Sequence, residues 1–320
     1  MKILAIQNRM GIGDTVIFLP FIKALYKKFN SPISLLVKES SKADQYLFQT
    51  NYIDKILILE RDSNNNSRHS GFLGSLNLIK DLKKHNFDKI FIFNSSLRFN
   101  LIARFSKIPE IYQYPLFDKN KQHITNTPRK FLKDKLNIEV SEDPNIQINN
   151  KLITEAFEKF QINRNELNIL LGVGGSGSTK RIPSKTFLEV IDKILKIKKC
   201  KFFLATGKNS EEQIILNELL ESKFKDLFVR LDNFSIKETL PIIKCCDLSI
   251  CNDSSFSHLS AALGIKTITL MADTPLIYGN YSSKMFPVIP EGEDTVSHNT
   301  LGKEKINSQE IFNKITKIYN

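Results

Sequence analysis

The chain has 320 residues and is 41% hydrophobic, a length that favours two domains and a composition that supports packed cores. Its formal net charge of +12 favours anionic partners such as nucleotide phosphates, phosphorylated glycans, a membrane surface or nucleic acid, although a solvated lysine-rich surface explains the same charge. No secretory signal stands at the start, and the longest later apolar run, residues 15–22, is too short to cross a bilayer. We therefore expect a cytoplasmic protein, for which attachment to a membrane surface through basic patches stays open.

The four cysteines do not have the spacing of metal ligands. Cys245 and Cys246 are adjacent, and Cys200 and Cys251 each lie in an expected strand. We expect four buried thiols in a reducing compartment.

Short apolar runs alternate with amphipathic stretches along the chain. In the first half they predict strands at 3–6, 33–37, 55–59 and 88–93 and helices at 14–28, 42–48, 72–85, 98–105 and 129–136, with an irregular stretch between Pro109 and Pro115. In the second half they predict strands at 167–173, 201–205, 227–231, 248–251 and 265–271 and helices at 151–160, 185–197, 236–244, 256–263 and 308–319, with another that begins at 211. This alternation predicts parallel sheets, and the polar segment 137–150 is expected to connect domains at 1–150 and 151–320.

A glycine-containing turn follows the first strand and leads into Asp14. Gly11 and Gly13 suggest a dinucleotide motif, but Val16 stands where its third glycine belongs, and a carboxylate at the helix start already occupies the place of a pyrophosphate. Asp14 is therefore either the N-cap of this helix or a general base held at the mouth of a cleft. The two roles are compatible, because a cap also fixes the direction of the carboxylate.

The loop from Gly174 to Arg181 follows a buried strand and has the composition of an anion-binding loop. Its glycines let backbone amides approach a ligand, Ser176 and Thr179 carry hydroxyls, and Lys180 and Arg181 carry charge. It is not a Walker A loop, because no Gly-Lys-Ser/Thr follows at the required spacing. A flexible surface loop with ordinary charges is the alternative.

Glu211 opens the helix that follows the next strand. A carboxylate at this position either caps the helix or binds a ribose diol, as in dinucleotide sites. Both interpretations stay open.

The stretch 247–264 predicts a strand, a polar turn and a short helix. Ser254 and Ser255 offer N-cap hydroxyls to that helix. Asp253, both serines and His258 thus gather at the carboxyl end of a strand and the amino end of a helix. Open α/β sheets bind ligands there, and a helix amino end attracts phosphate.

Four motifs in both halves of the chain resemble glycosyltransferase family 9, the heptosyltransferases of lipopolysaccharide core assembly. They are Gly11-Ile-Gly-Asp14, Asn252-Asp-Ser-Ser-Phe-Ser-His258, Asp273-Thr-Pro275, and Lys180-Arg-Ile-Pro183, which is similar to the family's Lys-Arg-Trp-Pro. The resemblance implies an α/β GT-B fold, in which two Rossmann-like domains with parallel sheets face a central cleft. The amino-terminal domain would bind the acceptor and the carboxy-terminal domain the nucleotide sugar.

The resemblance also implies an inverting, metal-independent transfer of a heptose-like sugar from ADP-heptose to a lipopolysaccharide core or other surface glycan. No Asp-x-Asp pair is present to hold a metal diphosphate. Asp14 would deprotonate the acceptor hydroxyl, and Lys180 would stabilise the departing diphosphate. The acceptor site would include Gly11 and Gly13, and the donor site Ser176, Thr179, Arg181, Glu211, Asp253, Ser254, Ser255 and His258. The implied partners are a nucleotide sugar and an anionic glycolipid at the cytoplasmic face of the inner membrane, with no cofactor and no nucleic acid.

The chain departs from the family pattern at two positions. Ser255 stands where the family has glycine, and Ile182 where it has an aromatic residue. These changes motivate an alternative, a catalytically weakened GT-B protein that binds a nucleotide or glycan without turnover. Nucleic-acid binding is suggested by charge alone and lacks a recognisable motif.

Overall fold

The computed structural model describes residues 1–9, 11–61, 67–116 and 123–319. The chain divides into two compact units, Met1–Gln147 and Ile148–Asn320. The domain boundary expected after residue 150 lies three residues beyond Gln147. The acceptor and donor roles of the two units stay predictions.

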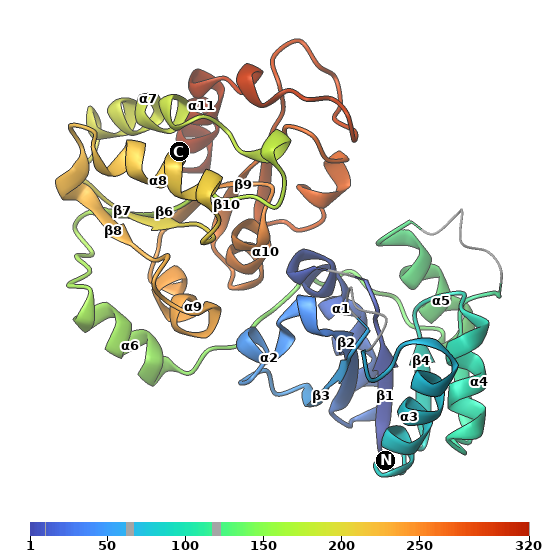
Figure 1. Ribbon diagram of the computed structural model, residues 1–320. Helices are drawn as coiled ribbons and strands as arrows, with labels where there is room; N and C mark the ends of the chain where they lie inside the picture. Colours follow the sequence, from blue (N-terminus) through green and yellow to red (C-terminus); the bar gives the residue numbers. More distant parts are fainter. Residues whose placement is uncertain (10, 62–66, 117–122, 320) are drawn as a thin grey trace. The chain divides into compact units, whose positions relative to one another are not determined.

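The first unit contains a parallel sheet with the strand order β3-β2-β1-β4-β5 (Figure 1). The strands are β1 (Ile3–Ile6), β2 (Ile33–Lys38), β3 (Ile53–Leu59), β4 (Lys89–Ile92) and β5 (Glu110–Gln113), and the helices are α1 (Ile12–Phe29), α2 (Ala43–Tyr46), α3 (Gly71–Lys83), α4 (Leu97–Phe105) and α5 (Asn126–Leu136). Side chains alternate between the two faces of a strand, so each face has its own core. Leu78 of α3 and Phe99 of α4 share a core with Leu4 of β1, and on the other face Phe93 packs against Phe18 of α1 and Phe131 of α5.

The segment between Pro109 and Pro115 is a strand, so the prediction of an irregular stretch is wrong. Its residues Glu110–Gln113 form β5, which pairs in parallel with β4 at the edge of the sheet. Proline is tolerated beside a short edge strand because few backbone donors are needed there.

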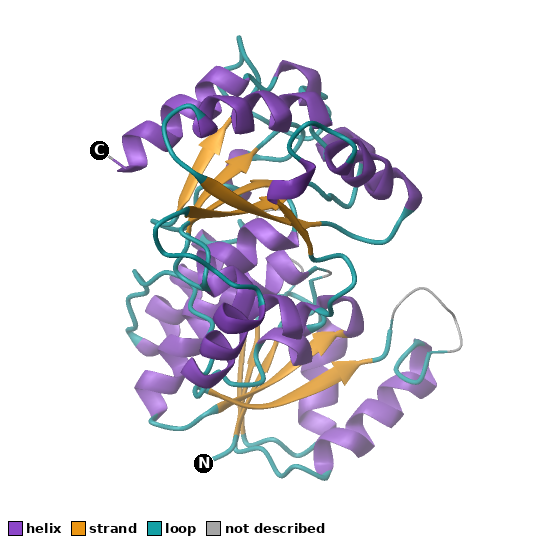
Figure 2. Cartoon of the chain, turned by 90° about the vertical axis from the view of Figure 1, so that its left-hand side faces the viewer, coloured by secondary structure: helices purple, strands orange, loops and turns teal. Residues whose placement is uncertain are grey.

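The second unit contains a parallel sheet with the order β11-β10-β9-β6-β7-β8. The strands are β6 (Leu167–Gly172), β7 (Cys200–Ala205), β8 (Phe228–Arg230), β9 (Leu248–Asn252), β10 (Lys266–Leu270) and β11 (Met285–Val288), and the helices are α6 (Asn150–Lys159), α7 (Ser184–Leu195), α8 (Ser210–Leu220), α9 (Ile236–Lys244), α10 (Ser255–Ala262) and α11 (Ser308–Tyr319). Helices lie on both faces of the sheet (Figure 2), and α7, α8 and α11 share one core. The sequence did not predict β11.

The chain reverses its direction across this sheet at β6, which lies between β7 and β9. Such a switch point is the usual ligand site of an open α/β sheet. Gly172 ends β6 opposite Cys251 of β9, and a Cβ at Gly172 would lie 2.6 Å from Cys251 Sγ. Position 172 therefore requires glycine, because a larger side chain would push apart the ends of β6 and β9, from which the two following loops start.

All four cysteines are free thiols. Cys200, Cys246 and Cys251 are buried as expected, whereas Cys245 at the end of α9 is only half-buried. Burial raises the pKa of Cys200 and of Cys251 to about 12, so both thiols stay protonated at neutral pH. No helix among the described residues is long and apolar enough to span a membrane.

Candidate functional site

Asp253 is the buried centre of a polar cluster at the carboxyl edge of the second sheet. It follows β9 directly and is 5% exposed. Its Oδ2 accepts a hydrogen bond of 2.9 Å from Lys180 Nζ, and its Oδ1 lies 3.8 Å from His258 Nε2. The carboxylate therefore connects the loop after β6 with the first turns of α10, and three residues predicted from two separate motifs meet at one point.

The ionised form of Asp253 is strongly favoured. Burial acts to raise its pKa, but contact with His258 and the charges of His258 and Lys180 together hold the pKa well below its ordinary value. The ammonium group of Lys180 is paired with Asp253. Because the lysine side chain is 23% exposed, it also reaches solvent. This arrangement presents a fixed positive charge at the sheet edge.

Tyr281 positions the imidazole of His258, and the sequence analysis missed it. Its Oη lies 2.7 Å from His258 Nδ1, and the two rings stack with centroids 5.6 Å apart and planes 17° apart. The residue comes from the loop that follows Asp273-Thr-Pro275. The one signal available in the sequence was an aromatic side chain a few residues after this motif.

Arg181 joins the loop after β6 to the start of α8. It is 8% exposed, donates from Nη1 to Asn209 Oδ1 at 3.2 Å and forms an ion pair with Glu211. Asn209 is the N-cap of α8, so the interpretation of Glu211 as the helix cap is wrong. The side chain of Glu211 is 64% exposed and remains available to a ligand.

Glu212 holds the glycine-rich loop from inside the protein, a role that the sequence did not predict. It is 7% exposed, and its Oε1 accepts a hydrogen bond of 2.7 Å from the amide of Gly175. A Cβ at Gly174 would lie 2.5 Å from Oε1, and one at Gly207 would overlap the same carboxylate. These two glycines thus make room for an internal anion, and the amide of Gly175 is not open to a ligand phosphate.

Asn252 holds the other side of this loop. Its Nδ2 donates to the carbonyl of Val173 at 2.8 Å, and its Oδ1 accepts from the amide of Ile182 at 3.4 Å. The asparagine is completely buried, as is the side chain of Ile182, which belongs to the core under α7. The first residue of the Asn252–His258 motif is therefore structural.

Ser254 is the N-cap residue of α10, but its hydroxyl does not cap the helix. Its Oγ is buried and has no hydrogen-bond partner among the described residues. Ser255 is already the first residue of the helix, so the prediction that both hydroxyls act as N-caps is wrong. A buried hydroxyl with unused hydrogen-bonding capacity at a helix amino end is suited to a phosphate oxygen.

Thr179 belongs to the short 3-10 helix η3 (Ser178–Lys180), and its hydroxyl contacts Asp273. Asp273 Oδ1 also accepts from the amide of Leu301 at 2.9 Å. Burial acts to raise the pKa of Asp273, but the Leu301 amide and the Thr179 hydroxyl hold it below its ordinary value. The carboxylate of Asp273 thus connects its own segment with those of Thr179 and Leu301. Ser176, in the glycine-rich loop before Thr179, is exposed.

Asp14 lies in the first turn of α1, in the first unit. The helix begins at Ile12 with Gly11 as its N-cap, so the N-cap role predicted for Asp14 is wrong, and Gly13 is the second helical residue. A Cβ at Gly11 would lie 3.7 Å from Asp14 Oδ2, which shows that the carboxylate lies back over the helix start. An anion there is favoured by the helix dipole.

The described residues contain no group of three or more His, Cys, Asp or Glu side chains that could hold a metal ion. The positive charges beside Asp253 come from Lys180 and, when protonated, from His258. The cluster is therefore equipped to meet an anionic ligand with side chains of the protein.

The sequence is similar to known proteins along nearly its whole length. A model of glycosyltransferase family 9 (heptosyltransferase) matches residues 75–305. Lipopolysaccharide heptosyltransferase 1 of Campylobacter coli is 26% identical, with 95% of this chain and 93% of that protein covered. Lipooligosaccharide heptosyltransferase 2 of Campylobacter jejuni is 29% identical over 82% of this chain and 78% of that protein.

Solved structures share the fold. The Escherichia coli ADP-heptose lipopolysaccharide heptosyltransferase II aligns with a TM-score of 0.73 at 15% identity, covering 99% of this chain and 98% of that one. A glycosyl transferase family 9 protein of Veillonella parvula aligns with a TM-score of 0.79 at 17% identity, covering 99% of this chain and 96% of that one. The Escherichia coli heptosyltransferase WaaC with ADP aligns with a TM-score of 0.74 at 13% identity over 99% of both chains. The prediction of a GT-B fold built from two Rossmann-like units is confirmed.

The adjacent residues Glu211 and Glu212 allow a matched test of the internal anion. Glu212→Ala leaves the buried amide of Gly175 without its acceptor, so we expect the free energy of unfolding to fall by about 1–3 kcal/mol. Glu211→Ala removes an exposed ion-pair partner and should cost less than about 1 kcal/mol. Urea denaturation measures the free energy of unfolding of both variants. Equal losses would contradict the assignment of Glu212 as the residue that holds the loop.

Asp253 should make stability depend on pH in a defined direction. An unfolded aspartate titrates near pH ~4, and the pKa of native Asp253 is lower. The ionised carboxylate therefore contributes fully to the free energy of unfolding above pH ~4, and this contribution is lost as the pH falls from there toward the native pKa. The unfolding free energy of wild type should therefore exceed that of Asp253→Asn at neutral pH. The difference should shrink by at most about 1.4 kcal/mol for each pH unit below about 4. Acid denaturation followed by circular dichroism measures it, and a difference that stays constant down to acid pH would refute the account.

Proposed function

The chain belongs to glycosyltransferase family 9 and is a glycosyltransferase, and we propose that it transfers a heptose-like sugar from ADP-heptose to a lipopolysaccharide core or other surface glycan. The observation that carries this proposal is the cluster of Lys180, Asp253 and Ser254 at the switch point of the second sheet. The names of the Campylobacter relatives support the sugar and the acceptor, and the Escherichia coli structure with ADP supports the nucleotide.

On the donor side, the diphosphate is bound by three kinds of group in and beside the cluster. These are the ammonium group of Lys180, the unpaired hydroxyl of Ser254 and the first-turn amides of α10. As the bond between the sugar and the diphosphate breaks, negative charge grows on the phosphate, and Lys180 stabilises it. Asp253 keeps the lysine in place before the donor arrives and then accepts a hydrogen bond from a sugar hydroxyl.

Glu211 binds the ribose in this proposal. Its exposed carboxylate can accept hydrogen bonds from two adjacent hydroxyls, as acidic residues do in dinucleotide sites. The buried guanidinium of Arg181 pairs with Glu211 and fixes the orientation of its carboxylate. The same ion pair links the phosphate-binding loop with the ribose-binding helix α8.

The two departures from the family pattern are compatible with turnover. Ile182 is completely buried in the core, so the missing aromatic ring changes packing and not a donor contact. Ser255 keeps its backbone amide at the start of α10, where a phosphate needs it. Both observations favour a working transferase over the alternative of a protein that only binds a nucleotide or glycan.

On the acceptor side, Asp14 acts as the general base. Its position in the first turn of α1 favours the ionised carboxylate, which takes the proton of the acceptor hydroxyl. The hydroxyl oxygen then attacks the anomeric carbon while the bond to the diphosphate breaks, so one displacement inverts the configuration. We assign Gly11 and Gly13 to the acceptor side, because glycines at the helix start let a bulky glycan approach the carboxylate.

The acceptor in this proposal is an anionic glycolipid. The net charge of +12 suits such a partner, and we place the reaction at the cytoplasmic face of the inner membrane.

Two substitutions test the assigned roles with ADP-heptose and a lipopolysaccharide core acceptor. Lys180→Ala should lower kcat by about 10²–10³-fold, because it removes charge stabilisation of the leaving group. Asp14→Asn should lower kcat by about 10²–10⁴-fold but leave ADP binding unchanged, because it removes only the base. Steady-state kinetics and calorimetry measure the two quantities.

Lys185→Ala is the matched control, since Lys185 is an exposed lysine just beyond the same loop and should not affect kcat. A wild-type protein that binds ADP but turns over no donor would establish the binding-only alternative. An unchanged kcat in Lys180→Ala would remove that residue from the leaving-group role.

A further inference from the structure

Large apolar side chains are exposed together on two neighbouring helices of the first unit, α3 and α4. They are Phe72, Leu73, Leu76, Leu97, Leu101 and Phe105, and the exposed fraction reaches 80% at Phe72 and 63% at Phe105. The other exposed large apolar residues of the described chain stand singly along the sequence. We call these six side chains the α3–α4 apolar surface.

Helical spacing places these side chains on one outward surface. Leu97, Leu101 and Phe105 follow one another at intervals of four residues and therefore form a stripe along α4. The opposite sides of the two helices bury Leu78 and Phe99 in one core. Because both helices cover the same face of the sheet, their exposed stripes point away from it together. Large apolar side chains that are exposed together on a folded monomer commonly mark a surface that binds something.

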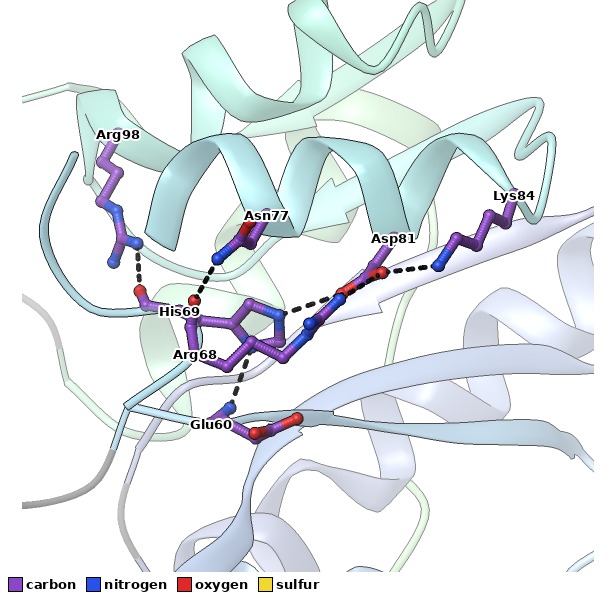
Figure 3. A network of polar contacts seen from close by, with 7 residues as sticks. All are labelled: Glu60, Arg68, His69, Asn77, Asp81, Lys84 and Arg98. Atoms are coloured by element: carbon purple, nitrogen blue, oxygen red, sulfur yellow. Dashed lines mark hydrogen bonds and ion pairs between the residues drawn. The ribbon is translucent and has the colours of Figure 1, made fainter. Parts of the chain in front are cut away.

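A polar network fixes α3 and α4 relative to each other (Figure 3). Arg98 of α4 donates to the carbonyl of His69 and to Ser75 Oγ on α3. Asp81 of α3 accepts from Arg68 at 2.7 Å and contacts His69 Nε2 at 3.3 Å. The surface is therefore preformed, and its two stripes do not have to be assembled when a partner binds.

Basic side chains border the α3–α4 apolar surface. Residues 67–108 contain eight Lys and Arg but only two Asp and no Glu. Lys80 and Lys83 continue the exposed side of α3 beyond the apolar residues, and Arg104 stands beside Phe105 on α4. Apolar side chains flanked by lysine and arginine are typical of protein surfaces that lie on anionic lipid.

A second copy of the chain fits this surface less well. A twofold interface would place the same patch against itself and bring the basic borders of the two copies together. Like charges facing each other are destabilising, whereas anionic headgroups complement them. The charge pattern therefore favours a lipid bilayer over a dimer.

We propose that the α3–α4 apolar surface docks the protein on the surface of an anionic phospholipid bilayer. The apolar side chains enter the boundary between headgroups and acyl chains, and Lys80, Lys83 and Arg104 contact the headgroups. This inference rests on the proposed function only in that a lipid-anchored acceptor gives docking a purpose. Binding to bare vesicles requires no sugar transfer, so the two claims can fail separately.

The test is co-sedimentation of the full chain with vesicles of phosphatidylglycerol and phosphatidylcholine in equal amounts. The pair Phe72→Ser with Phe105→Ser should lower the partition coefficient about tenfold or more, because both side chains leave the interface. The pair Ile197→Ser with Ile214→Ser is the matched control, since these isoleucines are 64% and 57% exposed on the second unit. It should bind the vesicles like wild type.

A second pair of substitutions, Lys80→Glu with Lys83→Glu, tests the basic border. It should weaken binding to anionic vesicles about tenfold and leave the weak binding to pure phosphatidylcholine unchanged. The melting temperature of each variant shows whether it is folded, and turnover of a delipidated acceptor should match wild type in every variant.

Three results would overturn the proposal. They are a wild type that does not bind vesicles, equal losses in the two serine pairs, and a wild-type dimer that the Phe72→Ser, Phe105→Ser pair converts to a monomer without any vesicle binding. The last result would assign the surface to a second copy of the chain. An inactive wild type that still binds vesicles would count against the proposed function alone.

Discussion

The carboxylate of Asp253 imposes the main constraint on the second unit. A charge buried at 5% exposure is costly unless it is paired, and Lys180 and His258 supply the pairing. Since these two residues come from different segments, the loop after β6 and the helix after β9 must approach each other. Tyr281 adds a third segment, because it fixes His258. One ionised side chain thus determines where these three segments lie and where the lysine points.

A second buried carboxylate, that of Glu212, has a different task. It occupies the space where Gly174 and Gly207 lack a Cβ atom, and it accepts a hydrogen bond from the amide of Gly175. The glycine-rich loop is thus held by the protein's own anion and needs no ligand to be ordered, which is the kind of support that a precise site requires. The cluster then offers an anion the partly exposed ammonium group of Lys180 and the buried, unpaired hydroxyl of Ser254, which are fewer donors than the loop composition suggests.

The sequence predicts those parts of the molecule that depend on local pattern. Buried strands such as Leu248–Asn252 are recognisable from apolar runs, and parallel pairing brings their carboxyl ends to one edge, so the meeting of Lys180 with Asp253 follows from topology. The edge strands β5 and β11 escaped prediction because each is four residues long and contains or adjoins a proline. Their pairing depends on neighbours distant in the sequence.

Other features depend on tertiary structure that no local pattern encodes. Glu211 and Glu212 are adjacent and chemically alike, and the position of the two glycines determines which of them turns inward. Tyr281 lies 23 residues from His258 and has no spacing that marks it as a partner. The start of α1 is two residues before Asp14 because Gly11 adopts the extended backbone of an N-cap, a position that glycine tolerates well.

The central claim is that the Lys180–Asp253 cluster binds the diphosphate of an adenine nucleotide. Isothermal titration calorimetry of the full chain with ADP, GDP and UDP tests it most directly. The account predicts that ADP binds more tightly than the other two and that Lys180→Ala weakens ADP about tenfold or more, which is about 1.4 kcal/mol. Equal affinity for ADP in wild type and Lys180→Ala would contradict the account.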